Sequence, residues 1–231
     1  MSAFQIKAIA IVCMIIDHLG VFLFPQIFWL RLVGRIAFPL FAWLIANGAH
    51  YTHDMRSYLK RLFIFALISQ IPFTLATQQI SGPTIFYLNI FFTLFLGLSA
   101  IYVIKTQSNK WLWLISTLAA AGIADLVQSD YGAAGVLSIV AFYLFFENIW
   151  YMAVAQMLIM GALPWLTLYI LQQTFYLPLE YMYLTSSFEY FGLLALVFIF
   201  FYNKKPGWKD GHLLYAFYPL QFIVFFLLKV V

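Results

Sequence analysis

The stretch FQIKAIAIVCMIIDHLGVFLF, residues 4–24, decides the fold class of this chain. It is apolar over the length that an α-helix needs to cross a bilayer, about 20 residues. Asp17 and His18 interrupt the stretch and no small-residue cleavage site follows it, so we predict a retained membrane helix and not a signal sequence. Similar stretches recur along the chain, in which 65% of the residues are hydrophobic and only 9% are charged. These are too few polar side chains to coat a water-soluble globule, so lipid must be the solvent.

Counting these apolar stretches gives the expected architecture. We predict nine membrane helices, near residues 4–24, 28–48, 61–79, 85–104, 111–127, 132–147, 149–171, 186–202 and 212–230. The fold class is therefore all-α, a polytopic helical membrane bundle. A tight polar hairpin is expected between the fifth and sixth helices, and Pro164 is expected to kink the seventh. We see no internal repeat and no low-complexity linker, so we predict a single domain over residues 1–231.

The basic residues predict the orientation of the bundle. With a cytoplasmic N-terminus, nine of the twelve lie on the cytoplasmic side: Lys7, Arg56, Lys60, Arg61, Lys105, Lys110, Lys204, Lys205 and Lys209. This bias follows the positive-inside rule, and we predict a multi-pass protein of the cell (inner) membrane. The net charge of +4 is thereby explained by topology, and no nucleic-acid partner is predicted. Because His50 and His53 lack a third donor at ligand spacing, no metal site is predicted either.

Two polar residues of the first stretch share one helical face. Lys7 and His18 are eleven residues apart, which amounts to three helical turns plus about 20° and a rise of roughly 16 Å. A charged or polar group at membrane depth is costly and usually functional. A long ligand with an anionic head is able to bridge the two side chains. The alternative is that His18 is a hydrogen-bonded packing residue.

A second set of polar residues belongs to the outer half of the bundle. Arg31 and Arg35 form an i, i+4 pair, and Asp17, which points about 100° away from His18, is the expected ion partner of one of them. The other polar residues predicted at this depth are Asn89, Thr93, Asp125, Asp130 and Glu189. We predict that they converge on one wet cavity. The alternatives are that the arginines snorkel to the interface and that the two hairpin aspartates cap a turn.

The sequence also resembles a known family. The matching segments are KAIAIVCMIIDHLG from Lys7, RLVGRIAFPLFAWLIANGAHYTH from Arg31, SYLKRLFIFALISQIPF from Ser57, LNIFFTLFLGL from Leu88, SDYGAAGVL from Ser129 and LLYAFYPL from Leu213. Together they resemble the TraX family, named for the F-pilin acetylation protein. That family is in turn similar to the acyltransferase-3 and heparan N-acetyltransferase superfamily of membrane acyltransferases. Acyltransferase-3 proteins carry a basic residue, ten further residues and a histidine on the first helix, which Lys7 and His18 reproduce.

The resemblance implies an acetyltransferase that uses cytosolic acetyl-CoA. The implied cofactor-binding residues are Lys7, Arg56, Lys60 and Arg61, which would hold the phosphates. The implied catalytic residues are His18, as general base or acyl carrier, Asp17 beside it, and Arg35 or Asn89, which would polarise the thioester carbonyl. The implied acceptor is an amine or hydroxyl at the outer face, on a pilin-like protein N-terminus or a glycan, with membrane lipid around the bundle.

One residue departs from the family pattern, and two other functions stay open. Family members often end the last motif with FYPxH, where this chain has Gln221. A second catalytic histidine is therefore excluded at that position. The first alternative function is a proton-coupled transporter or flippase with His18, Asp17 and Arg35 as an ion relay, although the absence of an internal repeat counts against it. The second is a non-catalytic membrane assembly factor whose polar residues only join helices.

Overall fold

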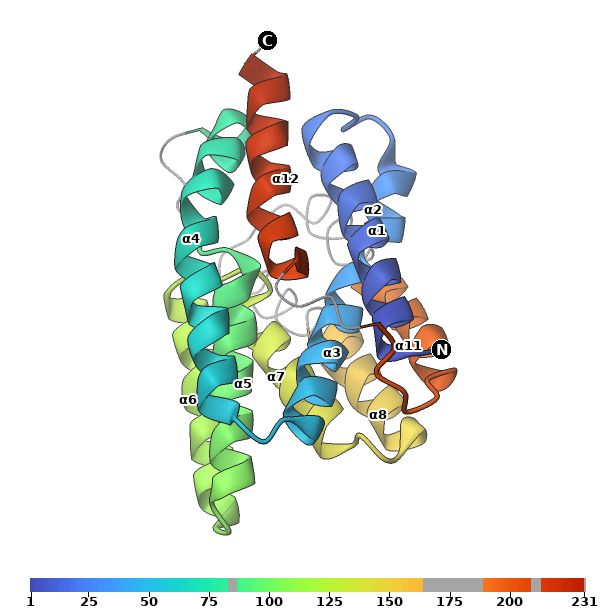
Figure 1. The fold of residues 1–231 in the computed structure, drawn as a ribbon, viewed down its shortest axis with the longest axis vertical. Coiled ribbons are helices and arrows are strands. Elements are labelled where there is room, and N and C mark those ends of the chain that lie inside the picture. The colour runs from blue at the N-terminus through green and yellow to red at the C-terminus, as the bar shows by residue number, and fades with distance from the viewer. Residues whose placement is uncertain (83–86, 164–188, 209–212, 231) are drawn as a thin grey trace, which may run out of the picture. The chain divides into compact units, whose positions relative to one another are not determined.

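The computed structural model describes residues 1–82, 87–163, 189–208 and 213–230, and Figure 1 follows their path. Within these ranges the elements are helices, and the extended backbone pairs only in an isolated bridge between Leu88 and Ser129. Each apolar stretch predicted from the sequence carries helical residues. The prediction of an all-α, polytopic helical bundle is confirmed. The kink predicted at Pro164 lies outside the described residues.

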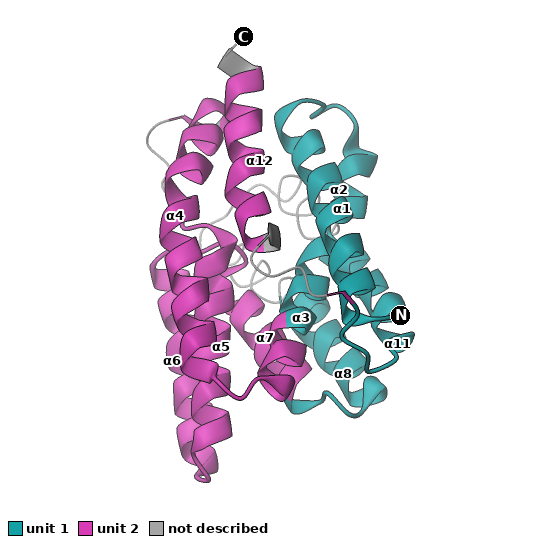
Figure 2. Ribbon diagram, viewed as in Figure 1, with its two compact units in different colours: residues 1–44, 144–207 teal, residues 45–143, 208–231 magenta. Residues whose placement is uncertain are grey.

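The helices gather into two compact units, coloured separately in Figure 2. Unit 1 consists of residues 1–44 and 144–207, and unit 2 of residues 45–143 and 208–231. Each unit therefore combines segments that are far apart in the sequence. Helix α3 (Ala37–Tyr51) is continuous through the boundary between Leu44 and Ile45. The single domain predicted over residues 1–231 stays a prediction.

Unit 1 is built around the first membrane helix. Its other elements are α2 (Phe28–Gly34), the first half of α3, α8 (Ile149–Gln156), the π-helical turn η1 (Met157–Ala162), the 3-10 helix η2 (Tyr190–Leu194) and α11 (Ala195–Phe200). Helix α1 (Ala3–Phe22) begins with a capping box, in which the Ser2 hydroxyl accepts from the Gln5 amide while the Gln5 side chain accepts from the Ser2 amide. This box satisfies two backbone donors that would otherwise be unpaired.

The predicted helix over residues 28–48 is wrong in one respect, because the chain makes two helices there. Helix α2 ends at Gly34, and Arg35 and Ile36 form a turn before α3 starts. Pro39 accounts for the break, since it has no amide hydrogen to donate to the carbonyl of Arg35 four residues earlier. The interruption places Arg35 at the junction of α2 and α3.

Unit 2 contains the longest helix of the described chain. Its elements are α4 (Met55–Ser81), α5 (Ile90–Thr106), α6 (Lys110–Leu126), α7 (Gly132–Leu144) and α12 (Leu213–Val230), with the end of α3. Helix α4 starts six residues earlier than the predicted residue 61, because the Asp54 carboxylate accepts the Ser57 amide at 2.9 Å and caps the helix. Arg56 and Lys60 therefore lie on its first two turns and not in a loop.

The polar hairpin predicted between the fifth and sixth stretches is confirmed. The Asp125 carboxylate accepts the Ala133 amide at 2.6 Å, and Gly132 has a φ of 45°, which favours glycine. Leu88 pairs with this hairpin, accepting from the Asp130 amide and donating to the Gln128 carbonyl. Asp125 thus caps the turn between α6 and α7, which is the structural role that the sequence left open for it.

Several helices present apolar side chains outward. In the described chain α1, the α2–α3 segment and α4 are long and apolar enough to cross a membrane, and the other apolar helices are shorter. On α6, Trp111 is 72% exposed and Leu126 is 83% exposed. Such surfaces are unfavourable in water and favourable against acyl chains. They are the lipid-facing sides of a membrane bundle.

Within each unit, the described basic residues that are predicted to be cytoplasmic lie at one end, and Lys209 lies outside the described residues. In unit 1 the backbone of Ala3 and Phe4 bonds to the carbonyls of Lys205 and Pro206, so this loop lies at the start of α1. In unit 2 the Lys105 ammonium donates to the carbonyls of Ala49 and Thr52, where α3 ends and α4 begins. The grouping agrees with the positive-inside bias. Which side of the membrane these ends face stays a prediction.

Candidate functional site

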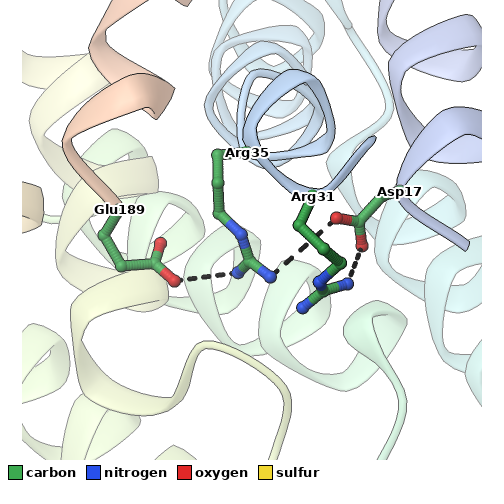
Figure 3. Close-up of polar contacts among 4 residues, drawn as sticks. All are labelled: Asp17, Arg31, Arg35 and Glu189. Atoms are coloured by element: carbon green, nitrogen blue, oxygen red, sulfur yellow. Dashed lines mark hydrogen bonds and ion pairs between the residues drawn. The ribbon is translucent and has the colours of Figure 1, made fainter. Parts of the chain in front are cut away.

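Four charged side chains of unit 1 form a connected cluster, drawn in Figure 3. Arg31 Nη1 lies 2.7 Å from Asp17 Oδ2, and Arg35 Nη1 lies 2.8 Å from Glu189 Oε1. Arg35 Nη2 is 3.9 Å from Asp17 Oδ1, which links the two pairs. The exposed fractions of the four side chains range from 14% for Arg35 to 32% for Arg31. We call Asp17, Arg31, Arg35 and Glu189 the charge cluster.

Glycines bring the helices of the charge cluster together. A β-carbon on Gly34 would overlap the Asp17 carboxylate, and one on Gly20 would lie 2.9 Å from the Leu30 β-carbon. Both glycines therefore permit the close packing of α1 on α2. The predicted pairing of Asp17 with an outer arginine is confirmed, and it involves both Arg31 and Arg35.

The fourth member of the cluster arrives from a distant part of the chain. Glu189 directly precedes η2, and η2 packs on the α2–α3 junction through Gly192. A β-carbon on Gly192 would lie 3.1 Å from both the Arg35 carbonyl oxygen and Pro39 Cγ. The carbonyl that Pro39 leaves without an amide donor is thus covered by a glycine backbone. Glu189 was expected at this depth, but nothing in the sequence identified Arg35 as its partner.

His18 and Lys7 lie on one uninterrupted helix, α1, beside the charge cluster. Since α1 runs without a break from Ala3 to Phe22, the face shared by Lys7 and His18 is preserved. Both side chains are half-buried, and the His18 ring meets the Phe22 ring edge-on at 6.2 Å. Asp17 faces the two arginines, as expected from its predicted direction about 100° away from His18.

The remaining predicted basic residues belong to unit 2. Arg56 Nε donates to the Tyr102 hydroxyl at 3.3 Å, and the Arg61 guanidinium lies over the Tyr58 ring at 5.6 Å from its centroid. Lys60 is exposed on the same helical turns of α4. Within the described residues none of these three cations pairs with a carboxylate. They are available to an anion at this end of unit 2.

Asn89 also lies in unit 2, where its side chain is fully used by the fold. Its amide nitrogen donates to the Ala66 carbonyl and to Gln70 Oε1, both at 2.8 Å, and its carbonyl accepts the Phe91 amide. It is 0% exposed and caps α5. These contacts give Asn89 a structural role and leave no amide hydrogen for a thioester carbonyl. Gln70, its partner on α4, was not identified from the sequence.

Two further predicted residues have structural partners. The Thr93 hydroxyl donates to the Asp130 carbonyl and lies 3.0 Å from the Ser129 hydroxyl, and these two contacts hold α5 against the hairpin after α6. His50 lies in the last turn of α3 with its ring stacked on Tyr143 at 4.3 Å. These residues, like Asn89, belong to unit 2, whereas the charge cluster belongs to unit 1. The single wet cavity predicted for all of the outer polar residues therefore stays a prediction.

Comparisons with known proteins show which family the sequence is similar to. The family model described as TraX protein matches residues 2–229. A probable fimbrial assembly protein FimC of Dichelobacter nodosus is 29% identical, over 95% of this chain and 92% of its own length. The TraX protein of Escherichia coli is 30% identical, over 60% of this chain and 54% of its own length. No solved structure matches the chain significantly. The family match covers nearly all of the sequence, so the chain belongs to the TraX family.

Proposed function

We propose that this protein is a transmembrane acetyltransferase that moves an acetyl group from cytosolic acetyl-CoA to an amine or hydroxyl acceptor at the outer face. The observation that carries the proposal is the placement of Lys7 and His18 on one face of the unbroken helix α1. The two are roughly 16 Å apart along its axis. A cation near the helix start and an imidazole three turns deeper suit a donor whose charged head and reactive thioester are far apart.

The proposed reaction needs one base at membrane depth. The acceptor nitrogen or oxygen attacks the thioester carbonyl carbon while a His18 ring nitrogen takes its proton. The carbon–sulfur bond then breaks, and the sulfur leaves as CoA thiol after receiving that proton. In the covalent variant His18 attacks first and the acetyl group rests on its ring before it passes to the acceptor. Both routes consume one thioester and yield one amide or ester.

The donor's phosphates would be held by the basic residues. Lys7, Arg56, Lys60 and Arg61 are the proposed ligands, through charge-assisted hydrogen bonds. The lack of carboxylate partners for the three unit 2 residues in the described chain supports this role. Arg35 is the proposed donor to the thioester carbonyl, because its guanidinium carries several N–H groups and lies in the charge cluster beside α1, the helix of His18.

The proposed acceptor and location take account of the relatives. A fimbrial assembly protein of similar length and the pilin acetylation that the family resemblance implies both favour a pilin-like protein N-terminus, with a glycan as the second possibility. The proposed location is the cell (inner) membrane, with the protein as a multi-pass enzyme. The apolar spans of α1, α2–α3 and α4 support the membrane location.

The test is acetyl transfer by the purified protein to an amine-terminated peptide, followed by mass spectrometry. His18→Ala should lower the rate by about 100-fold or more, the usual contribution of a general base. The matched control is His53→Ala, because His53 is exposed in the α3–α4 connection. A His18→Ala protein that inserts normally and still transfers acetyl at the wild-type rate would remove His18 from the mechanism.

A second candidate function, a non-catalytic assembly factor, is favoured by one observation. The four charges of the charge cluster neutralise one another in two short ion pairs, as expected if they only join helices. The two functions differ in ligand response. Acetyl-CoA should raise the melting temperature of an acetyltransferase in detergent and leave that of an assembly factor unchanged.

A further inference from the structure

Helix α12 of unit 2 runs parallel to α4. Three contacts define the register: Phe65 stacks on Tyr215 at 5.1 Å, Phe73 meets Phe222 at 5.2 Å, and the Gln79 amide donates to the Phe226 carbonyl at 3.4 Å. The residue numbers rise together along both helices, so their directions agree. The space between these helices is filled mainly by aromatic side chains.

Gln221 lies near the middle of α12 and is buried there without hydrogen bonds. It is 7% exposed, and neither its Oε1 nor its Nε2 has a partner in the described part of the chain. Tyr218 and Phe225, one turn before and after it, are buried and apolar in character. A carboxamide in such surroundings costs free energy unless something binds it. A leucine or methionine would cost less.

Other buried polar side chains in the described part of unit 2 do not leave a separate donor atom and a separate acceptor atom unpaired. Ser69 presents only a hydroxyl, Asn47 only a carbonyl oxygen, and Gln79 uses its amide on Phe226. Among the described residues for which no further contact exists, Gln221 leaves two separate buried atoms unpaired, the Nε2 donor and the Oε1 acceptor, whereas Ser69 leaves a single hydroxyl. The complement of a carboxamide is a group that likewise offers one acceptor and one N–H donor, which is an amide.

The position of Gln221 relative to the basic residues indicates which ligand supplies this amide. Arg61 lies over the Tyr58 ring, and the Tyr58 hydroxyl is hydrogen-bonded to that of Tyr215. Tyr215 precedes Gln221 by six residues, about 9 Å along the helix axis. A ligand with its anionic head at Arg61 and an amide-bearing, otherwise uncharged arm along α12 therefore meets Gln221. The pantetheine arm of CoA carries two amides between its phosphates and its sulfur.

We infer that Gln221 is a donor-binding residue whose carboxamide hydrogen-bonds an amide of the pantetheine arm of acetyl-CoA. The inference rests on the proposed acetyltransferase function and adds a binding residue to it. Because the residue cannot titrate, it contributes to binding and orientation and not to proton transfer. Its unpaired carboxamide lowers the stability of the ligand-free protein and gains its hydrogen bonds when the donor binds.

The test compares Gln221→Met, which preserves volume, with wild type. The ligand-free melting temperature should rise by a few degrees, because an unpaired buried amide is removed. The affinity for acetyl-CoA should fall by about 5- to 10-fold, the loss of one or two neutral hydrogen bonds. Gln221→Leu serves as the second variant should the methionine protein fold poorly, and binding is measured by calorimetry on protein in detergent.

A matched control separates the inference from general packing effects. Gln79→Met removes a half-buried glutamine between α4 and α12, whose amide is bonded to the Phe226 carbonyl. It should lower the melting temperature and leave the affinity for acetyl-CoA unchanged. A Gln221→Met protein that is less stable than wild type, or that binds acetyl-CoA equally well, overturns the inference alone. Wild-type protein that binds no acetyl-CoA overturns the proposed function, and the inference with it.

Discussion

The arginines of unit 1 and the basic residues of unit 2 carry the same charge in opposite settings. Arg31 and Arg35 lie in a membrane-depth cluster and each is held by a carboxylate within 2.8 Å. The side chains of Arg56 and Arg61 contact tyrosines and, in the described chain, form no ion pair with a carboxylate. Charges at membrane depth must be neutralised in the fold, whereas charges near a helix end can be left for a ligand. Removing a charge should therefore damage stability in unit 1 and ligand binding in unit 2.

The largest effect is expected from Arg35→Ala. This change leaves the partly buried carboxylates of Asp17 and Glu189 without one of their partners. Breaking a fully buried ion pair lowers the free energy of unfolding by about 3–5 kcal/mol. The expected loss is smaller here, because the Glu189 side chain is 23% exposed. Unfolding in mixed detergent, followed by circular dichroism, measures the loss. Arg56→Ala is the matched control and should be nearly neutral. Equal stability of the two variants would contradict the proposed difference between the arginines of unit 1 and those of unit 2.

A smaller effect is expected from Gly34→Ala in the same cluster. The added β-carbon overlaps the Asp17 carboxylate, so α1 and α2 must separate, at about 1–3 kcal/mol. Gly122→Ala on α6 is the control, because a β-carbon there meets nothing within 4 Å and alanine is the better helix former. The control should gain up to about 1 kcal/mol. A gain at Gly34 would show that the helices are not in contact through it.

For unit 2 the comparison predicts a change in binding. Lys60→Ala with Arg61→Ala should weaken acetyl-CoA binding by about 10- to 100-fold, since two charge-assisted contacts are lost. The loss should shrink as salt concentration rises, because exposed charges are screened. Lys110→Ala, at the exposed start of α6, is the control. Unchanged affinity in the double variant would remove these residues from the donor site.

The smallest effect concerns the start of α4. Hydrogen bonds from Ser57 lower the pKa of the Asp54 carboxyl below its usual value. The stability from this cap is present above the unfolded pKa and is lost as pH falls through the lowered folded one. Thermal melts between pH 6 and pH 3 should show a smaller decline for Asp54→Asn, which keeps a side-chain acceptor without titrating. An identical decline in both proteins would contradict a role for this cap.

The sequence predicts the helices well because lipid imposes a length on each apolar stretch. It also predicts that Asp17 pairs with an arginine, because both are predicted in the outer halves of adjacent helices, and the pair is present in the structure. The Arg35–Glu189 pair was not predictable, since its members are 154 positions apart and no local pattern joins them. The early start of α4 was missed because residues 55–60 are polar, and the helix there depends on a cap more than on hydrophobicity.

The most direct test of the account uses proteoliposomes with acetyl-CoA on one side and an amine-terminated peptide on the other. We predict acetylated peptide when acetyl-CoA is on the side that bears Lys60 and Arg61, and none with His18→Ala. Absence of transfer from either side, with correctly inserted wild-type protein, would contradict acetyl transfer across the membrane by this protein.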